Sequence, residues 1–245
     1  NLSTNFYIES GDTEKAIEAL DKSKANTDDA DVKENNTIKI IGLKLEKKDY
    51  KDMEKYLGEI SDPEERAYYS AQYYAQKKDP KLVKEYETLL KSEKYKAYAS
   101  KALGDYYFDK KDLAKSKKYY GTHVSVNKNP DEYVLYRLGQ ANEKENNLKM
   151  ALADYKLVYE KKGKLAEDAM LRAAEIYDRQ ENNVEAEKLF TKLYATKGNK
   201  DLKAYSIEKL IYYKLLNEKT KEAKKYYDEL KKLDAKRAEK FKAYF

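Results

Sequence analysis

The residues best suited to chemistry in this sequence are one histidine, many carboxylates and 26 tyrosines. Acid–base catalysis needs such groups to converge, with a nucleophile or a metal close by. His123 has no second histidine to work with, and carboxylate pairs such as Asp28-Asp29 fall near expected helix starts, where capping is their ordinary role. The sequence has no serine elbow or phosphate-binding glycine loop, and the lack of cysteine excludes thiolate catalysis and cysteine-ligated metals. We therefore expect no enzymatic activity, no catalytic residue, no metal site and no cofactor.

Many of the tyrosines stand in adjacent pairs, which are Tyr68-Tyr69, Tyr73-Tyr74, Tyr106-Tyr107, Tyr119-Tyr120, Tyr212-Tyr213 and Tyr226-Tyr227. Adjacent residues on a helix point about 100° apart, so one ring of a pair is expected in the core and the other in a groove or in solvent. Most of the rings are expected to pack in place of Phe and Trp. A minority has the properties of binding anchors, because a rigid ring buries a large area with little loss of entropy.

Helices must position these side chains, and the composition favours helices throughout. There are only 3 Pro and 8 Gly, too few for the turns of a β-sandwich or barrel. Hydrophobic residues make up 41% of the chain and charged residues 39%, which is typical of a solenoid with a narrow core rather than of a compact globule. The formal charge of +6 arises from finely alternating signs, a pattern of solvated helix faces rather than of a nucleic-acid-binding surface. No apolar run is long enough to be a transmembrane segment.

The sequence repeats itself with a period of about 35 residues. In this register Tyr120 aligns with Tyr155. His123 aligns with Val158 and Leu193, so we expect it on the buried side of a helix, as a packing residue.

A two-residue turn marker recurs with the repeat, at Gly11-Asp12, Lys48-Asp49, Lys78-Asp79, Lys111-Asp112, Asn146-Asn147, Asn182-Asn183 and, more loosely, 217–220. Its Asp or Asn is expected to cap the helix that follows. The prolines at 63, 80 and 130 each follow an Asp or Asn, so each is expected at the first position of a helix, after a capping residue.

Between the markers, apolar residues return at helical spacing and give two amphipathic helices in each period. Such a hairpin cannot bury both of its faces alone, so neighbouring hairpins must stack. We therefore predict an all-α protein, a right-handed α-solenoid of about seven stacked helical hairpins that forms a single domain over 1–245. The expected hairpins are approximately 1–27 (first helix incomplete), 28–60, 61–94, 95–128, 129–163, 164–198 and 199–233, with a closing helix over 234–245. The polar segment 25–36 is expected as a hinge or a disordered loop.

The pattern resembles the tetratricopeptide repeat (TPR) family over nearly the whole chain. Leu103, Gly104 and Tyr107 match the first helix of its hairpin, and Ala186 and Phe190 match the second. The resemblance implies a TPR-like superhelix and a role in protein binding. The Lys- and Tyr-rich composition is similar to that of bacterial cell-envelope members, such as outer-membrane assembly lipoproteins and the Tol-Pal coordinator. That similarity favours the bacterial periplasm or cell envelope over the cytoplasm.

The resemblance also implies that the first helix of each hairpin lines a concave groove. The positions aligned with that face hold Tyr68, Tyr98, Lys101, Tyr133, Tyr136, Leu171, Tyr205 and Glu208, with Gln72, Asp105, Gln140, Glu175 and Tyr212 one turn further on. We predict a non-catalytic scaffold or adaptor that binds a peptide or a partner protein, and not nucleic acid, through this Tyr-rich groove. Two alternatives are a nucleic-acid-binding helical repeat, suggested by the basic balance with interleaved Tyr and Lys, and the interaction arm of a larger multidomain protein. The sequence leaves the oligomeric state open.

Overall fold

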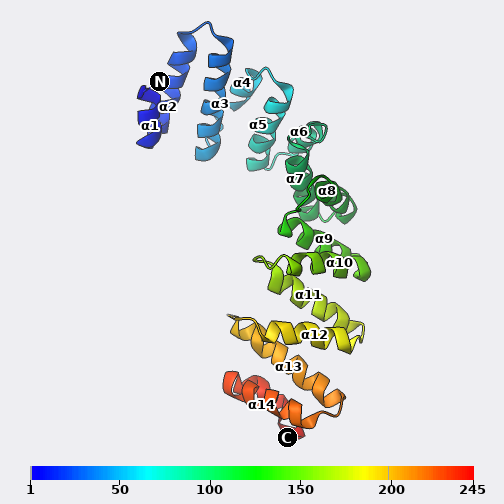
Figure 1. The fold of residues 1–245 in the computed structure, drawn as a ribbon. Helices are drawn as coiled ribbons and strands as arrows, with labels where there is room; N and C mark the ends of the chain where they lie inside the picture. Colours follow the sequence, from blue (N-terminus) through cyan, green and yellow to red (C-terminus); the bar gives the residue numbers. More distant parts are fainter. Residues whose placement is uncertain (1, 198) are drawn as a thin grey trace. The chain divides into compact units, whose positions relative to one another are not determined.

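The computed structural model describes residues 2–197 and 199–245, and every regular element within them is a helix. Helices that follow each other in the sequence pack against each other (Figure 1), which confirms the predicted all-α fold of consecutive hairpins. Contacts divide the chain into two compact units, 1–106 (unit 1) and 107–245 (unit 2). The helix α7 (Lys96–Asp109) contains the boundary. The single domain over 1–245 stays a prediction.

Unit 1 is built on short hairpins. Its helices before α7 are α1 (Leu2–Glu9), α2 (Thr13–Ala25), α3 (Ala30–Lys47), α4 (Met53–Gly58), α5 (Pro63–Gln76) and α6 (Leu82–Leu89). Ile40, Ile41 and Ile60 are fully buried in its core. Asp49 and Asp79 are closer together than any other successive turn markers, and the second helices α4 and α6 have only 6 and 8 residues.

The second helices of unit 2 are longer than α4 and α6 of unit 1. Unit 2 contains α8 (Leu113–Val126), α9 (Glu132–Lys144), α10 (Leu148–Glu160), α11 (Ala166–Arg179), α12 (Asn183–Tyr194), α13 (Lys200–Leu216), α14 (Thr220–Leu233), α15 (Ala235–Ala238) and the 3₁₀ helix η1 (Glu239–Tyr244). Its largest core buries Tyr155, Phe190 and Tyr213 completely. Gly139 is required in this core because a Cβ atom there would lie 2.7 Å from the Tyr155 ring. The segment predicted as a closing helix is helical, and Ala238 anchors it in the core of the last hairpin.

The turn inside each hairpin has the same backbone conformation from repeat to repeat. In each hairpin, a residue in the turn that follows the first helix adopts a positive φ. These residues are Gly11, Lys48, Lys78, Lys111, Asn146, Glu181 and Glu218. The N–H of the following residue then donates to a carbonyl five residues back, as from Asp112 to Tyr107. This closure satisfies a carbonyl that the end of a helix would otherwise leave without a partner.

Two of the predicted caps are confirmed, since Asp12 and Asp112 accept the N–H three residues further on, whereas Asn147 occupies the cap position of α10 without a side-chain hydrogen bond to the helix. The predictions for Asp49 and Asp79 were wrong. Each accepts the N–H two residues on and closes a small turn, so the second helix begins later and starts without them.

The sixth turn marker was placed one residue too late. The residue with positive φ is Glu181, and Asn182 rather than Asn183 caps α12. Gly198, which aligns with Gly163, lies outside the described residues.

Only one of the three proline predictions is confirmed. Pro63 opens α5 behind the cap Asp62. Pro80 lies in the turn before α6, and Pro130 precedes Asp131, which is the cap of α9. The carboxylate of Asp131 can accept the Tyr133 N–H only from the position directly before the helix.

The segment 25–36, predicted as a hinge or a disordered loop, is mostly helical. Asp29 accepts the N–H groups of Asp31 and Val32 and thereby starts α3 at Ala30. Asn36 is buried, and its amide donates to the Ser23 hydroxyl at 3.1 Å.

A carboxylate near the start of a first helix holds the loop that precedes the next hairpin. Glu34 accepts the N–H and the hydroxyl of Ser61, at 2.8 and 2.6 Å. Glu64 accepts the hydroxyl of Ser92 at 2.6 Å, and Glu132 binds the corresponding loop of unit 2 through a backbone N–H. These bonds tie successive hairpins together at one end.

Candidate functional site

A cleft of about 890 Å³ lies in unit 2 between α11, α13 and η1. Its lining residues are Asp178, Arg179, Glu181, Asn183, Tyr205, Glu208, Lys209, Tyr212, Leu216, Lys240 and Phe241. Three of them, Tyr205, Glu208 and Tyr212, were predicted for the groove. They are three and four residues apart on α13 and therefore share one face of that helix. We call this the α13 cleft.

The helix α13 separates a tyrosine pair as the sequence predicted. Tyr213 is fully buried and its hydroxyl donates to Asp178, whereas Tyr212 is 51% exposed at the cleft. Burial and the neighbouring carboxylate raise the pKa of Tyr213. The same prediction was wrong for Tyr119 and Tyr120, which are both buried, since α8 is covered on more than one side.

Ion pairs fix the walls of the α13 cleft. Glu208 is only 8% exposed, and its carboxylate lies 2.5 Å from Lys240 and 3.5 Å from Arg237. Asp178 is paired with Lys209. Because these carboxylates are already engaged by cations, they contribute shape and rigidity rather than a reactive base.

Beside these ion pairs the cleft has polar lining residues, which are Arg179, Glu181 and Asn183, and an apolar part. Leu216 is 52% exposed beside Tyr212, and Phe241 of η1 is half-buried. Tyr205 is held in place by an edge-on contact with Phe190, with 5.7 Å between the ring centroids. Exposed apolar side chains around a hollow lose unfavourable contact with water when a ligand covers them. The arrangement is suited to binding rather than to chemical transformation.

A smaller hollow of about 260 Å³ lies further along the first helices, lined by Gln140, Glu143, Lys144, Arg172 and Arg179. Arg179 borders both this hollow and the α13 cleft. It reaches back from α11 to Glu143 of α9 at 2.7 Å, and Glu143 also accepts the Tyr155 hydroxyl at 2.8 Å. Successive first helices of unit 2 are thus joined by ion pairs, and η1 supplies the last partner.

The sequence prediction missed the cations of this surface. Arg179 and Lys209 lie outside the selected helix positions. Arg179 follows its partner Glu143 by 36 residues, and Lys209 follows its partner Asp178 by 31. Opposite charges recurring at nearly the repeat length were the signal that could have identified them.

The other predicted residues of unit 2 are partly engaged in packing. Tyr133 accepts from Arg137 at 3.0 Å. Tyr136 and Leu171 pack against the main core, so only part of each side chain is available to a ligand. Gln140 lines the smaller hollow, and Glu175 lies 3.5 Å from the Tyr205 hydroxyl.

The predicted residues of unit 1 centre on an aromatic cluster. Tyr68 stacks on Tyr95 at 4.9 Å and lies 5.3 Å from Tyr98. Tyr98 is 38% exposed, and its hydroxyl is 3.5 Å from that of Tyr86. Burial raises the pKa of Tyr98, so the ring stays neutral. Tyr68, Gln72, Lys101 and Asp105 of the predicted set are half-buried here.

His123 is buried on α8, as its alignment predicted, and the amide of Asn127 lies 3.2 Å from its Nε2. In the described residues, no three His, Cys, Asp or Glu side chains are placed to hold a metal ion together. None of the described helices has the length and the apolar character needed to cross a membrane.

Comparison with known proteins gives structural relatives only. Models of protein families give no match to the sequence, and a search of curated proteins gives none either. Among solved structures, the chain is similar to the C-terminal part of a TPR repeat-containing protein from Cytophaga hutchinsonii, with a TM-score of 0.71 and 20% identity over 96% of both chains.

Two further structures are similar over much of their length. MamA has a TM-score of 0.52 and 17% identity, covering 69% of this chain and 96% of its own. The Pseudomonas aeruginosa protein pilF has a TM-score of 0.51 and 16% identity, covering 87% of this chain and 98% of its own. At these identities the likeness concerns the fold, and it confirms the TPR fold predicted from the sequence.

Proposed function

We propose that this chain is a non-catalytic scaffold that binds a peptide or a partner protein, and that the α13 cleft is its principal contact. The observation that carries the proposal is the exposure of Tyr212 and Leu216 at the edge of a cleft in which Asp178 is paired with Lys209 and Glu208 with Lys240. The TPR fold is compatible with this role, because stacked hairpins present the extended surfaces that repeat proteins use for binding.

A protein ligand suits this site better than a small molecule. The cleft offers large ring faces and few unengaged polar groups, so affinity must come from buried area. Tyr205 is held by packing before any ligand arrives, which reduces the entropy lost on binding. A peptide with an apolar side chain that inserts beside Tyr212 would use these features together.

Affinity capture from extracts of the native cells tests the proposal. Wild-type chain is compared with a Tyr212→Ala/Leu216→Ala variant, which removes the exposed apolar edge but leaves the buried Tyr213 and the ion pairs in place. We expect the variant to lose its captured proteins, by about tenfold or more, if these two residues are anchors.

The matched control is Val184→Ala, which removes an apolar side chain that is 76% exposed on α12 and does not line the α13 cleft. It is expected to capture the same proteins as wild type. Equal capture by all three chains would place the contact elsewhere and contradict the proposal.

The proposal excludes nucleic acid as the ligand of this cleft. Its cations Arg179, Lys209 and Lys240 are each paired with a carboxylate, so they do not form a surface that attracts phosphates. Binding of single-stranded DNA that weakened steeply with added salt would support the alternative.

A further inference from the structure

A second groove lies on another face of unit 2, between α10 and α11. It has a volume of about 420 Å³ and is lined by Lys149, Leu152, Ala153, Lys156, Tyr159, Ala173, Tyr177 and Gln180. On α11, residues 173, 177 and 180 lie roughly a third of a turn around the helix from Arg172 and Arg179. The groove is therefore separate from the α13 cleft and from the hollow beside it.

The groove is long enough for several turns of a helix. Its residues on α10 recur once per turn from Lys149 to Tyr159, a distance of about 15 Å along the helix axis. Ala173, which is 1% exposed, and Ala153 are the small residues among those that line it. Tyr159 and Tyr177 are half-buried beside them. Small residues between larger ones leave room for the bulky apolar side chains of a ligand.

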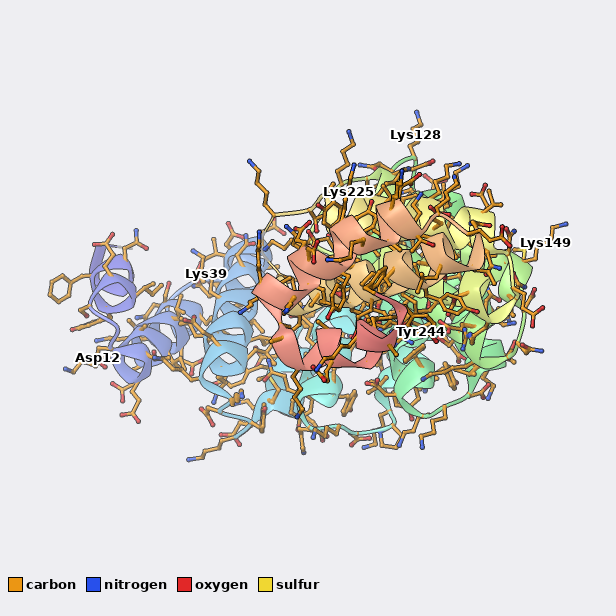
Figure 2. All side chains as sticks on the ribbon, turned by 90° about the horizontal axis from the view of Figure 1, so that it is seen from below. Asp12, Lys39, Lys128, Lys149, Lys225 and Tyr244 are labelled. Carbon is orange, nitrogen blue, oxygen red and sulfur yellow. The ribbon has the colours of Figure 1, made fainter. Side chains whose placement is uncertain are left out.

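The charged side chains that line the groove are both positive, although the carboxylates of Glu160 and Glu185 lie close enough to Tyr159 to act on it electrostatically. The lining residues of the groove include two lysines and no carboxylate. Lys156 has Glu160 at 3.8 Å, but both side chains are largely exposed, so this pair is weak. Lys149 extends from the ribbon into solvent (Figure 2). Positive groups beside an apolar groove complement negative charge that flanks an apolar stripe.

We propose that the α10–α11 groove binds an acidic amphipathic helix of a protein partner. The apolar stripe of that helix fills the groove, and its Asp or Glu residues meet Lys149 and Lys156. A helix satisfies its own backbone hydrogen bonds. An extended peptide would need strand edges to pair with, and the residues that line this groove lie in helices, apart from Gln180 in the turn after α11. The site is independent of the function proposed for the α13 cleft.

Fluorescence anisotropy with a labelled model peptide tests this proposal. The probe is a synthetic amphipathic helix of about 14 residues with leucines on one face and glutamates beside them. A second peptide carries lysine in place of each glutamate. We expect wild-type chain to bind the acidic peptide and not the basic one.

Two variants locate the site. Lys149→Glu/Lys156→Glu reverses the charge of the groove, and Ala153→Trp fills it, and each is expected to weaken binding of the acidic peptide by about tenfold or more. The control Lys225→Glu/Lys232→Glu changes the net charge by the same amount on exposed positions of α14 and is expected to alter binding by less than about twofold.

Three results would overturn the proposal. One is failure of the acidic peptide to bind the wild-type chain. Another is an equal loss of binding in the groove variants and the α14 control. The third is equal competition by single-stranded DNA, which would indicate non-specific attraction to positive charge. A thermal unfolding midpoint close to that of wild type verifies that each variant is folded.

Discussion

The two units share one repeat but join their successive first helices by different forces. In unit 1 the contact between α5 and α7 is aromatic, since Tyr68 of α5 lies 5.3 Å from Tyr98 of α7 and stacks on Tyr95 just before that helix. In unit 2 the contacts are ionic, with Glu143 of α9 bound to Arg179 of α11. Contacts between rings depend little on salt, whereas exposed ion pairs are screened by it. One repeat pattern can therefore be stabilised either by apolar contact or by charge.

The units also differ in the length of their second helices. Unit 2 has 12 to 14 residues in each of α8, α10, α12 and α14, whereas in unit 1 only α2, with 13, reaches that length and α4 and α6 have 6 and 8. Longer helices bury more apolar area in each hairpin. We therefore expect unit 2 to carry most of the stability.

The largest expected effect is on the core of unit 2. Phe190 is fully buried between Tyr205 and Tyr213, so Phe190→Ala should lower the free energy of unfolding by about 3 to 5 kcal/mol. Urea unfolding followed by circular dichroism measures this. Val184→Ala on the same helix is the control and should stay within about 0.5 kcal/mol of wild type. Similar losses in both variants would contradict the assignment of the core.

The next effect depends on pH and has opposite signs in the two units. In unit 2, burial raises the pKa of Asp154 to about 6, while an Asn142 hydrogen bond opposes the rise. Because the pKa is raised, Asp154 stays protonated to a higher pH in the folded protein than in the unfolded chain. Stability is therefore lost as pH rises from the ordinary pKa of 3.8 through about 6. Asp154→Asn should therefore stabilise the protein at pH 7.5, on the order of 2 kcal/mol, and have almost no effect below pH 4.

Glu59 in unit 1 gives the opposite slope. Burial would raise the pKa of its carboxyl, but hydrogen bonds from Lys24 and Thr37 outweigh burial, and the pKa is lowered. The stability that the Glu59 carboxylate contributes to the folded state is present at neutral pH and is lost as pH falls through that lowered pKa. Glu59→Gln should therefore destabilise at pH 7, with the loss disappearing in acid. Unfolding curves across the pH range test both variants, and slopes of the same sign would refute the comparison.

A third pair applies one substitution to each unit. Gly139→Ala in unit 2 should cost about 2 kcal/mol, because its Cβ would meet the Tyr155 ring at 2.7 Å. Gly42→Ala in unit 1 has open space around the new methyl group and should stabilise α3 by up to about 1 kcal/mol. Thermal or urea unfolding measures the change in stability of each variant. A gain in stability for Gly139→Ala would mean that the two helices of its hairpin are not so closely packed.

The smallest expected effect concerns salt. Arg179→Ala breaks an ion pair at a largely exposed arginine and should cost less than about 1 kcal/mol, with the cost shrinking as salt is added. Tyr68→Leu in unit 1 removes a ring stack, and its cost should not change with salt. Stability measured at low and high salt tests the contrast, and salt dependence of the tyrosine variant would remove the distinction.

Much of the fold could be predicted from the sequence because hairpin repeats encode it locally. Apolar spacing and turn residues such as Asp112 specify each hairpin without reference to distant parts of the chain. The predicted capping positions were wrong where two neighbouring residues could both cap a helix, as at Asn182 and Asn183. They were also wrong where Asp49 closed a turn instead of capping a helix. Such choices depend on a single hydrogen bond, which periodicity does not resolve.

The candidate site could be predicted only in part. The face of α13 that bears Tyr205 and Tyr212 follows from repeat alignment. The cations that shape the cleft do not, since Lys240 reaches Glu208 from a closing segment that has no counterpart in the repeat. The α10–α11 groove escaped the sequence prediction because one wall is α10, a second helix, and its residues on α11 lie outside the first-helix positions that the alignment selected.

Site-directed photo-crosslinking is the most direct test of the claim that the α13 cleft contacts a protein. A photoreactive phenylalanine derivative replaces Tyr212 in one chain and Val184 in another, and each is irradiated in the native cells. We expect a covalent adduct with a discrete partner protein from position 212 and none from position 184. Absence of an adduct at 212, or the same adduct from both positions, would contradict the claim.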